Sequence, residues 1–476
     1  MFTDHYPESL KMLTEMCKES YSIPKNAFQN ANVKRGLRNF DGSGIVAGVT
    51  NISMVHGYVL YEGEKMPDEG RLLYRGYDVP KLIDGYTNDN RYGYEECAFL
   101  LLFGFLPSQE QLDAFKSLVS ECSFLPQNFT EDIIMRAPSM NIMNKMQSSV
   151  LSLYTYDQNP EDMSIENQLR QSIQLIARLP IIAANAYSVK KHIFEDDSLL
   201  IHRPKEGLAT AQNFMRILGQ DVTFDEDEAR LLDVCLVLHA EHGGGNNSTF
   251  TCRAETSSGT DIYSATSAAI GALKGPKHGG ANIKVEEMFS EIKQNVKDWK
   301  DDEEVNAYLE KILRKEAGDG SGLIYGMGHA IYTKSDPRAV VLKKHAQALA
   351  EKKGFGDEFN LLKKIEELSP TAFLNITGHD KAICANVDMY SGLIYRMLGI
   401  PAELYTPLFA SARIAGWCAH RIEEMLTGGK IMRPAYKTIY KVKEYTPIDE
   451  RSNISNSATE PHQTGAALFI SLLFLF

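Results

Sequence analysis

The chain has 476 residues, with 50 basic and 62 acidic side chains, and its formal net charge at pH 7 is −12. A single hydrophobic core rarely grows beyond about 250 to 300 residues, so this length predicts two or more domains. The acidic balance, and the lack of a basic stripe with interleaved aromatic residues, argue against nucleic acid as a partner.

Seven cysteines are scattered along the chain, without a Cys-x-x-Cys pair and mostly among apolar neighbours. This spacing is typical of reduced core thiols in a cytoplasmic protein, and it disfavours a structural zinc site. The cysteines are Cys17, Cys97, Cys122, Cys235, Cys252, Cys384 and Cys418.

Neither end of the chain carries a clear targeting or membrane signal. The first residues are too polar and acidic for a secretory or transit segment, which predicts a cytoplasmic location. Residues 465–476 are apolar except for Ser471. This stretch is shorter than the roughly 20 residues that span a bilayer as a helix, so no membrane partner is expected.

Apolar residues recur mainly at helical spacing, which predicts an all-α, predominantly helical protein. The most strand-like piece comes first, at residues 51–62, where we expect a small hairpin at most. Residues 108–122 are predicted to form a helix that opens with a capping box between Ser108 and Gln111. Its expected apolar face consists of Leu112, Phe115, Leu118, Val119 and Cys122.

Two further helices are predicted to lead into glycine-rich loops. The first runs from about Asp225 to His239, because its acidic start suits the positive end of the helix dipole. It delivers His239 and His242 to a run of three glycines. The second covers residues 262–274, whose small side chains allow close packing inside a core, and it leads to His278.

Charge-dense stretches at residues 293–315 and 349–367 predict solvated helices of a smaller region. This region lies between the histidine-bearing loops and Asp388 in the sequence.

His278 lies between a Gly-Pro break and a Gly-Gly helix start. A helix that opens near Ala281 would place the imidazole beside unpaired backbone N–H groups and the positive end of the dipole, which disfavours protonation. A neutral histidine can donate a hydrogen bond to a carbonyl oxygen that gains negative charge, as in enolisation.

Three other residues could complete such chemistry. Asp388 could act as the base that removes a proton next to a carbonyl, His329 could act as a second acid, and Arg338 could hold a substrate carboxylate. Each motif alone also has a structural interpretation, since Asp388 could merely cap the helix that follows it.

His239 and His242 also raise the possibility of a metal-dependent hydrolase that uses His278 as a third ligand. The chain lacks a His-Glu-x-x-His sequence, and Glu241 is the only carboxylate nearby, so no metal is expected. No Walker sequence and no strand followed by Gly-x-Gly-x-x-Gly supports nucleotide chemistry on those folds.

Four sequence blocks, taken together and in this order, resemble the citrate synthase family. They cover residues 239–249, 275–282, 326–338 and 386–392, and they include all three candidate catalytic side chains. Further matches lie at residues 33–38, 73–78, 411–417 and 431–434. The resemblance therefore covers roughly residues 30 to 450.

The resemblance implies a mostly helical homodimer with two domains in each chain. A large helical domain would comprise residues 30–278 and 391–450, and a smaller mobile domain on the CoA side would comprise residues 279–390. The tail, residues 451–476, lies outside the resemblance and is expected to be disordered or foreign to the fold.

The activity that the resemblance implies is condensation of oxaloacetate with acetyl-CoA and water to citrate and CoA, with acetyl-CoA as a co-substrate and no cofactor. Asp388 would remove a methyl proton from acetyl-CoA while His278 stabilises the enol. His329 would then protonate the carbonyl oxygen of oxaloacetate.

Substrate-binding roles also follow from the resemblance. His242, Arg338 and Arg413 would hold the dicarboxylate, and Arg433 would reach in from the neighbouring subunit of a shared active site. Lys334 and Lys381 would meet the phosphates of CoA.

Two alternatives on the same scaffold remain open. A 2-methylcitrate synthase would share the catalytic trio and use propionyl-CoA. A non-catalytic regulator should lack a catalytic residue, yet His278, His329 and Asp388 are all present.

Overall fold

The computed structural model describes residues 8–451, apart from residues 22, 220, 428 and 440. Gly42–Arg433 form one compact unit, and the described parts of residues 1–41 and 434–476 form another. Every candidate site residue belongs to the first of these, the main unit. The predicted small domain, residues 279–390, lies within it, and its boundary with the large domain stays a prediction. The tail beyond residue 451 lies outside the described residues.

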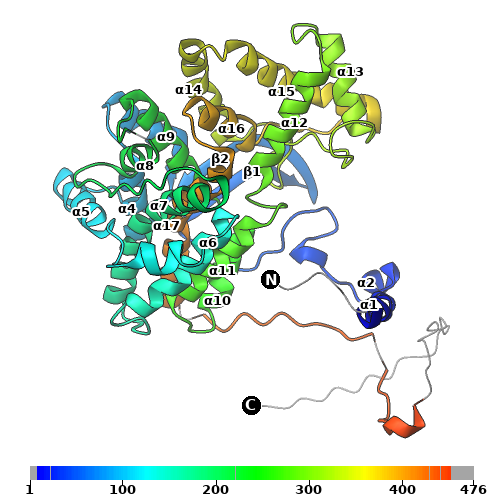
Figure 1. The fold of residues 1–476 in the computed structure, drawn as a ribbon. Helices are drawn as coiled ribbons and strands as arrows, with labels where there is room; N and C mark the ends of the chain where they lie inside the picture. Colours follow the sequence, from blue (N-terminus) through cyan, green and yellow to red (C-terminus); the bar gives the residue numbers. More distant parts are fainter. Residues whose placement is uncertain (1–7, 22, 220, 428, 440, 452–476) are drawn as a thin grey trace. The chain divides into compact units, whose positions relative to one another are not determined.

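The protein is predominantly helical, as predicted (Figure 1). The terminal unit contains α1 (Glu8–Ser20) and α2 (Lys25–Asn30). The helices of the main unit are α3 (Val79–Asn88), α4 (Tyr94–Phe103), α5 (Gln109–Cys122), α6 (Ile142–Leu153), α7 (Ile165–Glu195), α8 (Thr210–Leu218), α9 (Glu226–His239), α10 (Asn247–Thr256), α11 (Ile262–Lys274), α12 (Ala281–Asn295), α13 (Asp302–Leu313), α14 (Pro337–Lys353), α15 (Gly356–Thr377), α16 (Asp388–Met397) and α17 (Tyr405–Leu426).

The helices that carry clear terminal signals have the predicted boundaries. Helix α5 begins after a complete capping box between Ser108 and Gln111. Asp225 caps α9 by accepting hydrogen bonds from two backbone N–H groups of the first turn. The predicted face of α5 is wrong at Leu118, which is 42% exposed, because that side chain lies at the solvent edge of the apolar stripe.

One small antiparallel sheet interrupts the helices. Its strands are β1 (Ser53–Tyr61), β2 (Glu64–Tyr74) and β3 (Tyr77–Asp78), in that order. The predicted hairpin at residues 51–62 is therefore present as its first strand and turn, but the sheet is larger than expected. Its second strand contains Pro67 and Gly70, which weaken the sequence signal for a strand.

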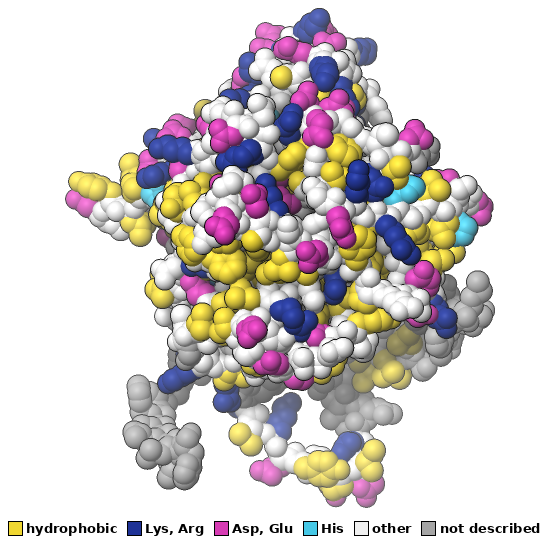
Figure 2. Space-filling model, turned by 90° about the vertical axis from the view of Figure 1, so that its left-hand side faces the viewer, with side chains coloured by type: hydrophobic (Ala, Val, Ile, Leu, Met, Phe, Trp, Pro, Cys, Tyr) yellow, Lys and Arg dark blue, Asp and Glu magenta, His cyan; other side chains and the backbone are white. Residues whose placement is uncertain are grey.

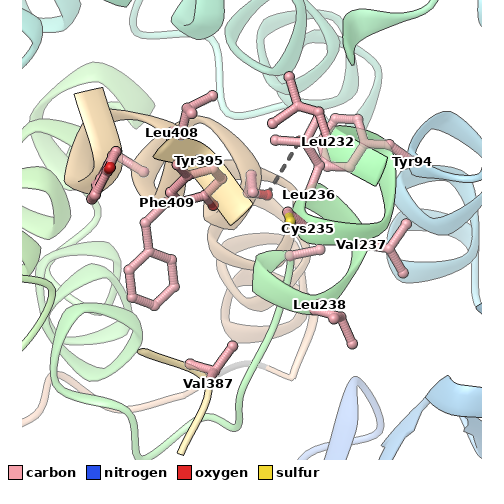
Figure 3. Close-up of a cluster of buried hydrophobic side chains, with 14 of the residues drawn as sticks. Tyr94, Leu232, Cys235, Leu236, Val237, Leu238, Val387, Tyr395, Leu408 and Phe409 are labelled. Carbon is pink, nitrogen blue, oxygen red and sulfur yellow. Dashed lines mark hydrogen bonds between the residues drawn. The ribbon is translucent and has the colours of Figure 1, made fainter. Parts of the chain in front are cut away.

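The core of the main unit lies where the buried apolar side chains of several helices meet. Helix α17 packs against α7 and α9, and α11 packs against α6 and α10. Figure 3 shows part of this core, where Leu232 and Leu236 of α9 share a cluster with Leu408 of α17 and Tyr395 of α16. Burying each large apolar side chain contributes about 1.5–3 kcal/mol.

Helices α12 to α16 gather at the top of Figure 1, apart from α4 to α11. Among them, α13 packs against α15, and α14 and α12 both pack against α16. The two predicted charge-dense stretches belong to this group. They are amphipathic rather than fully solvated, since Leu309 of α13 and Ile365 of α15 are completely buried.

All seven cysteines are free thiols, and five of them are buried. Cys17 is the exception to the predicted core location, because it is exposed on α1. Within residues 8–451, no helix is both long enough and apolar enough to cross a membrane. On the face drawn in Figure 2, basic and acidic side chains are interspersed, so neither sign of charge dominates that face.

Candidate active site

Backbone hydrogen bonds join the loop that carries His329 to the loop that carries Asp388. Met327 and Ala385 form an isolated antiparallel bridge. Within it, the Gly328 N–H donates to the Cys384 carbonyl at 2.8 Å, and the Asn386 side chain donates to the Gly328 carbonyl at 2.9 Å. Two of the three predicted catalytic residues therefore lie on directly connected backbone.

Asp388 is the first residue of α16, and its backbone N–H donates to Asn386 Oδ1 at 3.0 Å. Val387 occupies the N-cap position of α16, so Asp388 does not cap this helix, which was the alternative interpretation of its sequence position. Burial raises the pKa of Asp388 to about 6, against the opposing positive charge of Arg338. A carboxylate with this pKa is ionised at pH 7 and is a stronger base than an ordinary aspartate.

The imidazole of His278 has a defined tautomer. Its Nε2 accepts a long hydrogen bond from the Ser248 N–H, 3.4 Å away, and lies 3.1 Å from Ser248 Oγ. A backbone N–H can only donate, so the ring proton belongs on Nδ1. Burial and the charge of Arg413 lower the pKa of His278 to about 4, which keeps the ring neutral at pH 7. This agrees with the predicted neutral histidine, although burial rather than a helix dipole is the main cause.

His329 has the opposite tautomer. Its Nδ1 accepts from the backbone N–H groups of Ile331 and Tyr332, both at 3.1 Å. A neutral His329 therefore carries its proton on Nε2 and donates from that atom. The ring stacks on Tyr332, with 4.6 Å between ring centroids.

His242 lies beside His329, with the two ring centroids 5.1 Å apart and the planes nearly perpendicular. Its Nε2 is 3.2 Å from the hydroxyl of Tyr332. Burial lowers the pKa of His242 well below its usual value, and the charges of Arg338 and Arg413 lower it further. His242 is consequently a neutral, buried hydrogen-bonding group.

Arg338 is buried and held by a carboxylate of its own helix start. Asp336 caps α14 and accepts from Arg338 Nε at 3.0 Å and from Nη2 at 2.7 Å. These contacts fix the guanidinium plane, and the negative charge of Asp336 helps to raise the arginine pKa although burial alone would lower it.

Arg413 is completely buried in α17. Its Nε donates to the His239 carbonyl at 2.6 Å, whereas Nη1 and Nη2 have no hydrogen-bond partner among the described residues. Burial lowers the pKa of Arg413 to about 10, and Glu241 opposes that shift. A buried guanidinium with two unpartnered nitrogens suits a bidentate carboxylate.

Six of the predicted site residues thus share one electrostatic neighbourhood. Arg413 lowers the pKa of both His278 and His242, and Arg338 lowers the pKa of His242 and of Asp388. The three remaining predicted residues lie outside this buried group, because each of them is exposed. They are Lys334, Lys381 and Arg433. Their roles stay predictions.

The sheet holds the His329 loop in place, which the sequence did not indicate. Thr333 Oγ1 donates to the Asp68 carbonyl at 3.1 Å, and the Gly70 N–H donates to Ser335 Oγ at 3.1 Å. A Cβ at Gly57 would lie 2.6 Å from the Tyr332 Cα, so this close approach requires glycine.

Three residues with clear roles in the geometry were missed by sequence reasoning: Ser248, Tyr332 and Asp336. Each lies inside one of the recognised sequence blocks. The contacts of Ser248 and Tyr332 depend on tertiary structure, whereas Asp336 is a local N-cap, and its position directly before Pro337 was a usable signal. Within the described part of the chain, no three His, Cys, Asp or Glu side chains converge as metal ligands. His239 packs against Phe409 instead, with ring centroids 4.4 Å apart.

The fold and the site define a predominantly helical enzyme with a carboxylate base, neutral histidines and buried arginines. The family described as "Citrate synthase, C-terminal domain" matches residues 39–435. Citrate synthase from Corynebacterium glutamicum is 32% identical over 87% of this chain and 90% of its own length. Citrate synthase from Haloferax volcanii is 32% identical over 89% of this chain and its whole length.

Solved structures give the same result. Citrate synthase from Pyrobaculum aerophilum superposes with a TM-score of 0.70 at 27% identity, covering 88% of this chain and 95% of that one. Citrate synthase from Thermoplasma acidophilum, solved as a ternary complex with carboxymethyl coenzyme A and oxaloacetate, has a TM-score of 0.71 at 25% identity, covering 88% of this chain and 99% of that one. The chain belongs to the citrate synthase family, whose members are transferases of the tricarboxylic acid cycle.

Proposed function

We propose that this enzyme condenses oxaloacetate with acetyl-CoA and water, and that it releases citrate and free CoA. The observation that carries the proposal is the pair of histidines His278 and His329, whose ring nitrogens accept backbone hydrogen bonds at opposite positions, in one electrostatic neighbourhood with Asp388. The ternary complex of the Thermoplasma acidophilum relative, which holds oxaloacetate and a CoA derivative, supports the same choice of substrates.

In the first step, the Asp388 carboxylate removes a proton from the methyl carbon of the thioester. The electron pair of the broken C–H bond forms a carbon–carbon double bond, and the carbonyl electrons move to the thioester oxygen. His278 Nδ1–H donates a hydrogen bond to that oxygen as it gains charge. A histidine whose pKa is about 4 keeps its role as a neutral donor throughout the working pH range.

In the second step, the enol carbon attacks the ketone carbon of oxaloacetate. The ketone oxygen takes a proton from His329 Nε2 as the carbon–carbon bond forms, which gives citryl-CoA. Water then adds to the thioester carbonyl, the carbon–sulfur bond breaks, and the CoA sulfur leaves as a thiol. The products are citrate, CoA and one proton from the new carboxyl group. The proton that Asp388 took from the methyl carbon is released and His329 takes one up again, so both groups return to their starting states and atoms and charges balance.

His242, Arg338 and Arg413 bind oxaloacetate. The two arginines supply the charge that a dianion needs in a buried place, and Arg413 offers both Nη atoms to one carboxylate. In a homodimer, Arg433 of one subunit would complete the site of the other. Closure of residues 279–390 over the substrates would exclude water until citryl-CoA has formed.

The test is thiol release by the purified protein with oxaloacetate, comparing acetyl-CoA with propionyl-CoA in the presence and absence of a chelator. We expect chelator-resistant release with acetyl-CoA. A preference for propionyl-CoA would reassign the enzyme as a 2-methylcitrate synthase. The two thioesters have to be compared directly, because one methylene changes the affinity of a binding pocket by only about 1–3 kcal/mol. Loss of activity on chelation would favour the metal-dependent hydrolase, and no release with either thioester would overturn the proposal.

A further inference from the structure

Behind the candidate site, Glu241 and His420 form a completely buried contact. Glu241 lies in the turn between His239 and His242, and His420 lies on α17, seven residues after Arg413. Residues at this spacing lie on the same helix face. The His420 Nε2 is 2.9 Å from Glu241 Oε1, and neither side chain is exposed.

One oxygen of Glu241 takes up all the donors around it. Besides His420, Ser53 Oγ donates to Oε1 at 2.9 Å, and the Gly243 N–H donates to the same atom at 2.5 Å. Although burial alone would raise it, these partners and Arg413 hold the pKa of Glu241 at about 2. Glu241 is therefore a fixed negative charge under the turn that carries His242.

Arg413 has a carboxylate in its electrostatic neighbourhood and yet makes no hydrogen bond to it. Glu241 raises the pKa of Arg413, but Nη1 and Nη2 have no hydrogen-bond partner among the described residues. Arg338 differs, because Asp336 binds it directly through two nitrogens. Asp336 uses both of its oxygens for Arg338. Glu241 is held through Oε1 alone, and its Oε2 has no hydrogen-bond partner among the described residues.

The groups on the far side of His420 hold its ring in position. Arg253 Nη1 of α10 lies 3.0 Å from His420 Nδ1 and also donates to Glu423 at 2.7 Å. A Cβ at Gly244 would come within 3.3 Å of the ring. His420 is thus fixed from α10 and from the glycine-rich loop, with Nε2 directed at Glu241.

We propose that His420 is a positioning residue for Arg413. By engaging the carboxylate of Glu241, His420 keeps that carboxylate from pairing directly with Arg413, so both Nη atoms of the guanidinium stay available to a carboxylate of the substrate. The pair sets the affinity for oxaloacetate and leaves proton removal by Asp388 unaffected. This inference rests on the proposed function only in naming oxaloacetate as the ligand.

The main test compares His420→Leu with wild type, using calorimetric Kd values for oxaloacetate without acetyl-CoA, and kcat and KM from thiol release. Without its partner, Glu241 can turn to Arg413 and compete with the substrate. We expect the Kd and KM for oxaloacetate to rise about tenfold, the scale of one hydrogen bond to a charged group. The kcat at saturation and the KM for acetyl-CoA should stay within about twofold, because the reacting groups are untouched.

Two further variants separate positioning from general loosening of the core. His420→Gln keeps an N–H donor and should recover most of the affinity. The double variant His420→Leu with Glu241→Gln should bind oxaloacetate more tightly than His420→Leu alone, because a neutral amide competes less for Arg413. A double variant that binds as weakly as His420→Leu, or more weakly, would overturn the inference.

Tyr94→Phe is the matched control, because Tyr94 of α4 contacts the same helix as His420, α17. It removes buried hydrogen bonds to the Ser411 and Ala412 carbonyls without touching Glu241, so it should lower the melting temperature and leave the Kd unchanged. If His420→Leu does not fold, Ser53→Ala removes another donor to Glu241 Oε1 and should raise the Kd several-fold. An unchanged Kd in Ser53→Ala would then contradict the inference.

The outcomes also distinguish this inference from the proposed reaction. If wild type binds oxaloacetate but releases no thiol with either thioester, the reaction is wrong, and the Kd series still tests His420. If wild type releases thiol and the Kd is equal in wild type and His420→Leu, the reaction stands and the positioning role is wrong.

Discussion

At the scale of single residues, burial decides the chemistry of the site. The same loss of water raises the pKa of a carboxyl and lowers that of an imidazole, because in each case it disfavours the charged form. Burial raises the pKa of Asp388 to about 6, which makes it a stronger base, and lowers the pKa of His278 to about 4, which keeps it a neutral hydrogen-bond donor. One physical cause therefore prepares both partners of an enolisation.

Asp388→Asn tests the base assignment. We expect kcat to fall by about 100- to 10,000-fold, the usual contribution of a general base, while the Kd for oxaloacetate changes little. In wild type, kcat should fall as the pH drops through about 6, since Asp388 must be ionised to accept a proton. A pH profile of thiol release measures this limb, and near-normal turnover by the variant would remove Asp388 from the mechanism.

The same variant has a stability signature of known sign. The folded pKa of Asp388 lies above its unfolded value, so folding favours the protonated carboxyl. The stability that this gives is fully present below the unfolded pKa and is lost as the pH rises through about 6. Asp388→Asn should therefore melt no lower than wild type at pH 8. A large drop in the melting temperature would instead indicate a structural role for the carboxylate.

Arg413→Lys tests the bidentate contact. Lysine keeps the charge but lacks the planar pair of nitrogens, so the Kd for oxaloacetate should rise about tenfold or more. Titration calorimetry measures the change in Kd. The control is Lys116→Arg, which makes the reverse replacement at a position away from these loops and should leave the Kd unchanged. Unchanged affinity in Arg413→Lys would mean that Arg413 does not bind the substrate through two nitrogens.

At the scale of elements, local signals in the sequence were sufficient for the helices and insufficient for the sheet. Helix α5 could be predicted because its capping box acts within a few residues. Strand β2 was missed because Pro67 and Gly70 oppose a strand locally, and its pairing with β1 overrides them. The contacts of Tyr332 with His242 could not be predicted either, since they join residues far apart in sequence.

Gly57→Ala tests the sheet as the support of the His329 loop. The added Cβ would meet the Tyr332 backbone, so the loop must shift or the strand must bend. We expect kcat to fall by at least about tenfold, because small displacements of catalytic groups are costly. Gly85→Ala in α3, where a Cβ meets nothing within 4 Å, is the matched control and should retain full activity. Equal activity of the two variants would show that the sheet does not position His329.

At the scale of the whole molecule, a chain with net charge −12 is proposed to bind anionic substrates. The local positive charge of Arg338 and Arg413 has to overcome the repulsion between the negatively charged chain and an anionic substrate. Burial strengthens the attraction to these two arginines because it reduces screening by solvent. The sequence could name both arginines through its motifs. It could not show that Arg413 lies near Glu241 without a hydrogen bond to it, because that depends on how α17 packs, whereas the pairing of Arg338 with Asp336 is local to the start of α14.

The proposal of an active site shared between two subunits makes a prediction that requires a dimer. Arg433 is exposed in its own chain, after the end of α17, so a role in substrate binding requires a second subunit. We expect Arg433→Ala to weaken oxaloacetate binding, and a partner that keeps Arg433 but carries Asp388→Asn to restore activity. In such a mixed dimer, one of the two sites combines an intact Asp388 with the partner's intact arginine.

The measurement is thiol release, at an oxaloacetate concentration too low to saturate Arg433→Ala, after the two variants are mixed, dissociated and reassembled, with each variant treated alone as the control. Recovery should approach a quarter of wild-type activity, because about half of randomly reassembled dimers are mixed and each has one complete site of two. Each homodimer lacks one of the two groups at both sites, so activity above the controls can come only from exchange. Absence of recovery in dimers shown to be mixed would place Arg433 outside the partner's site.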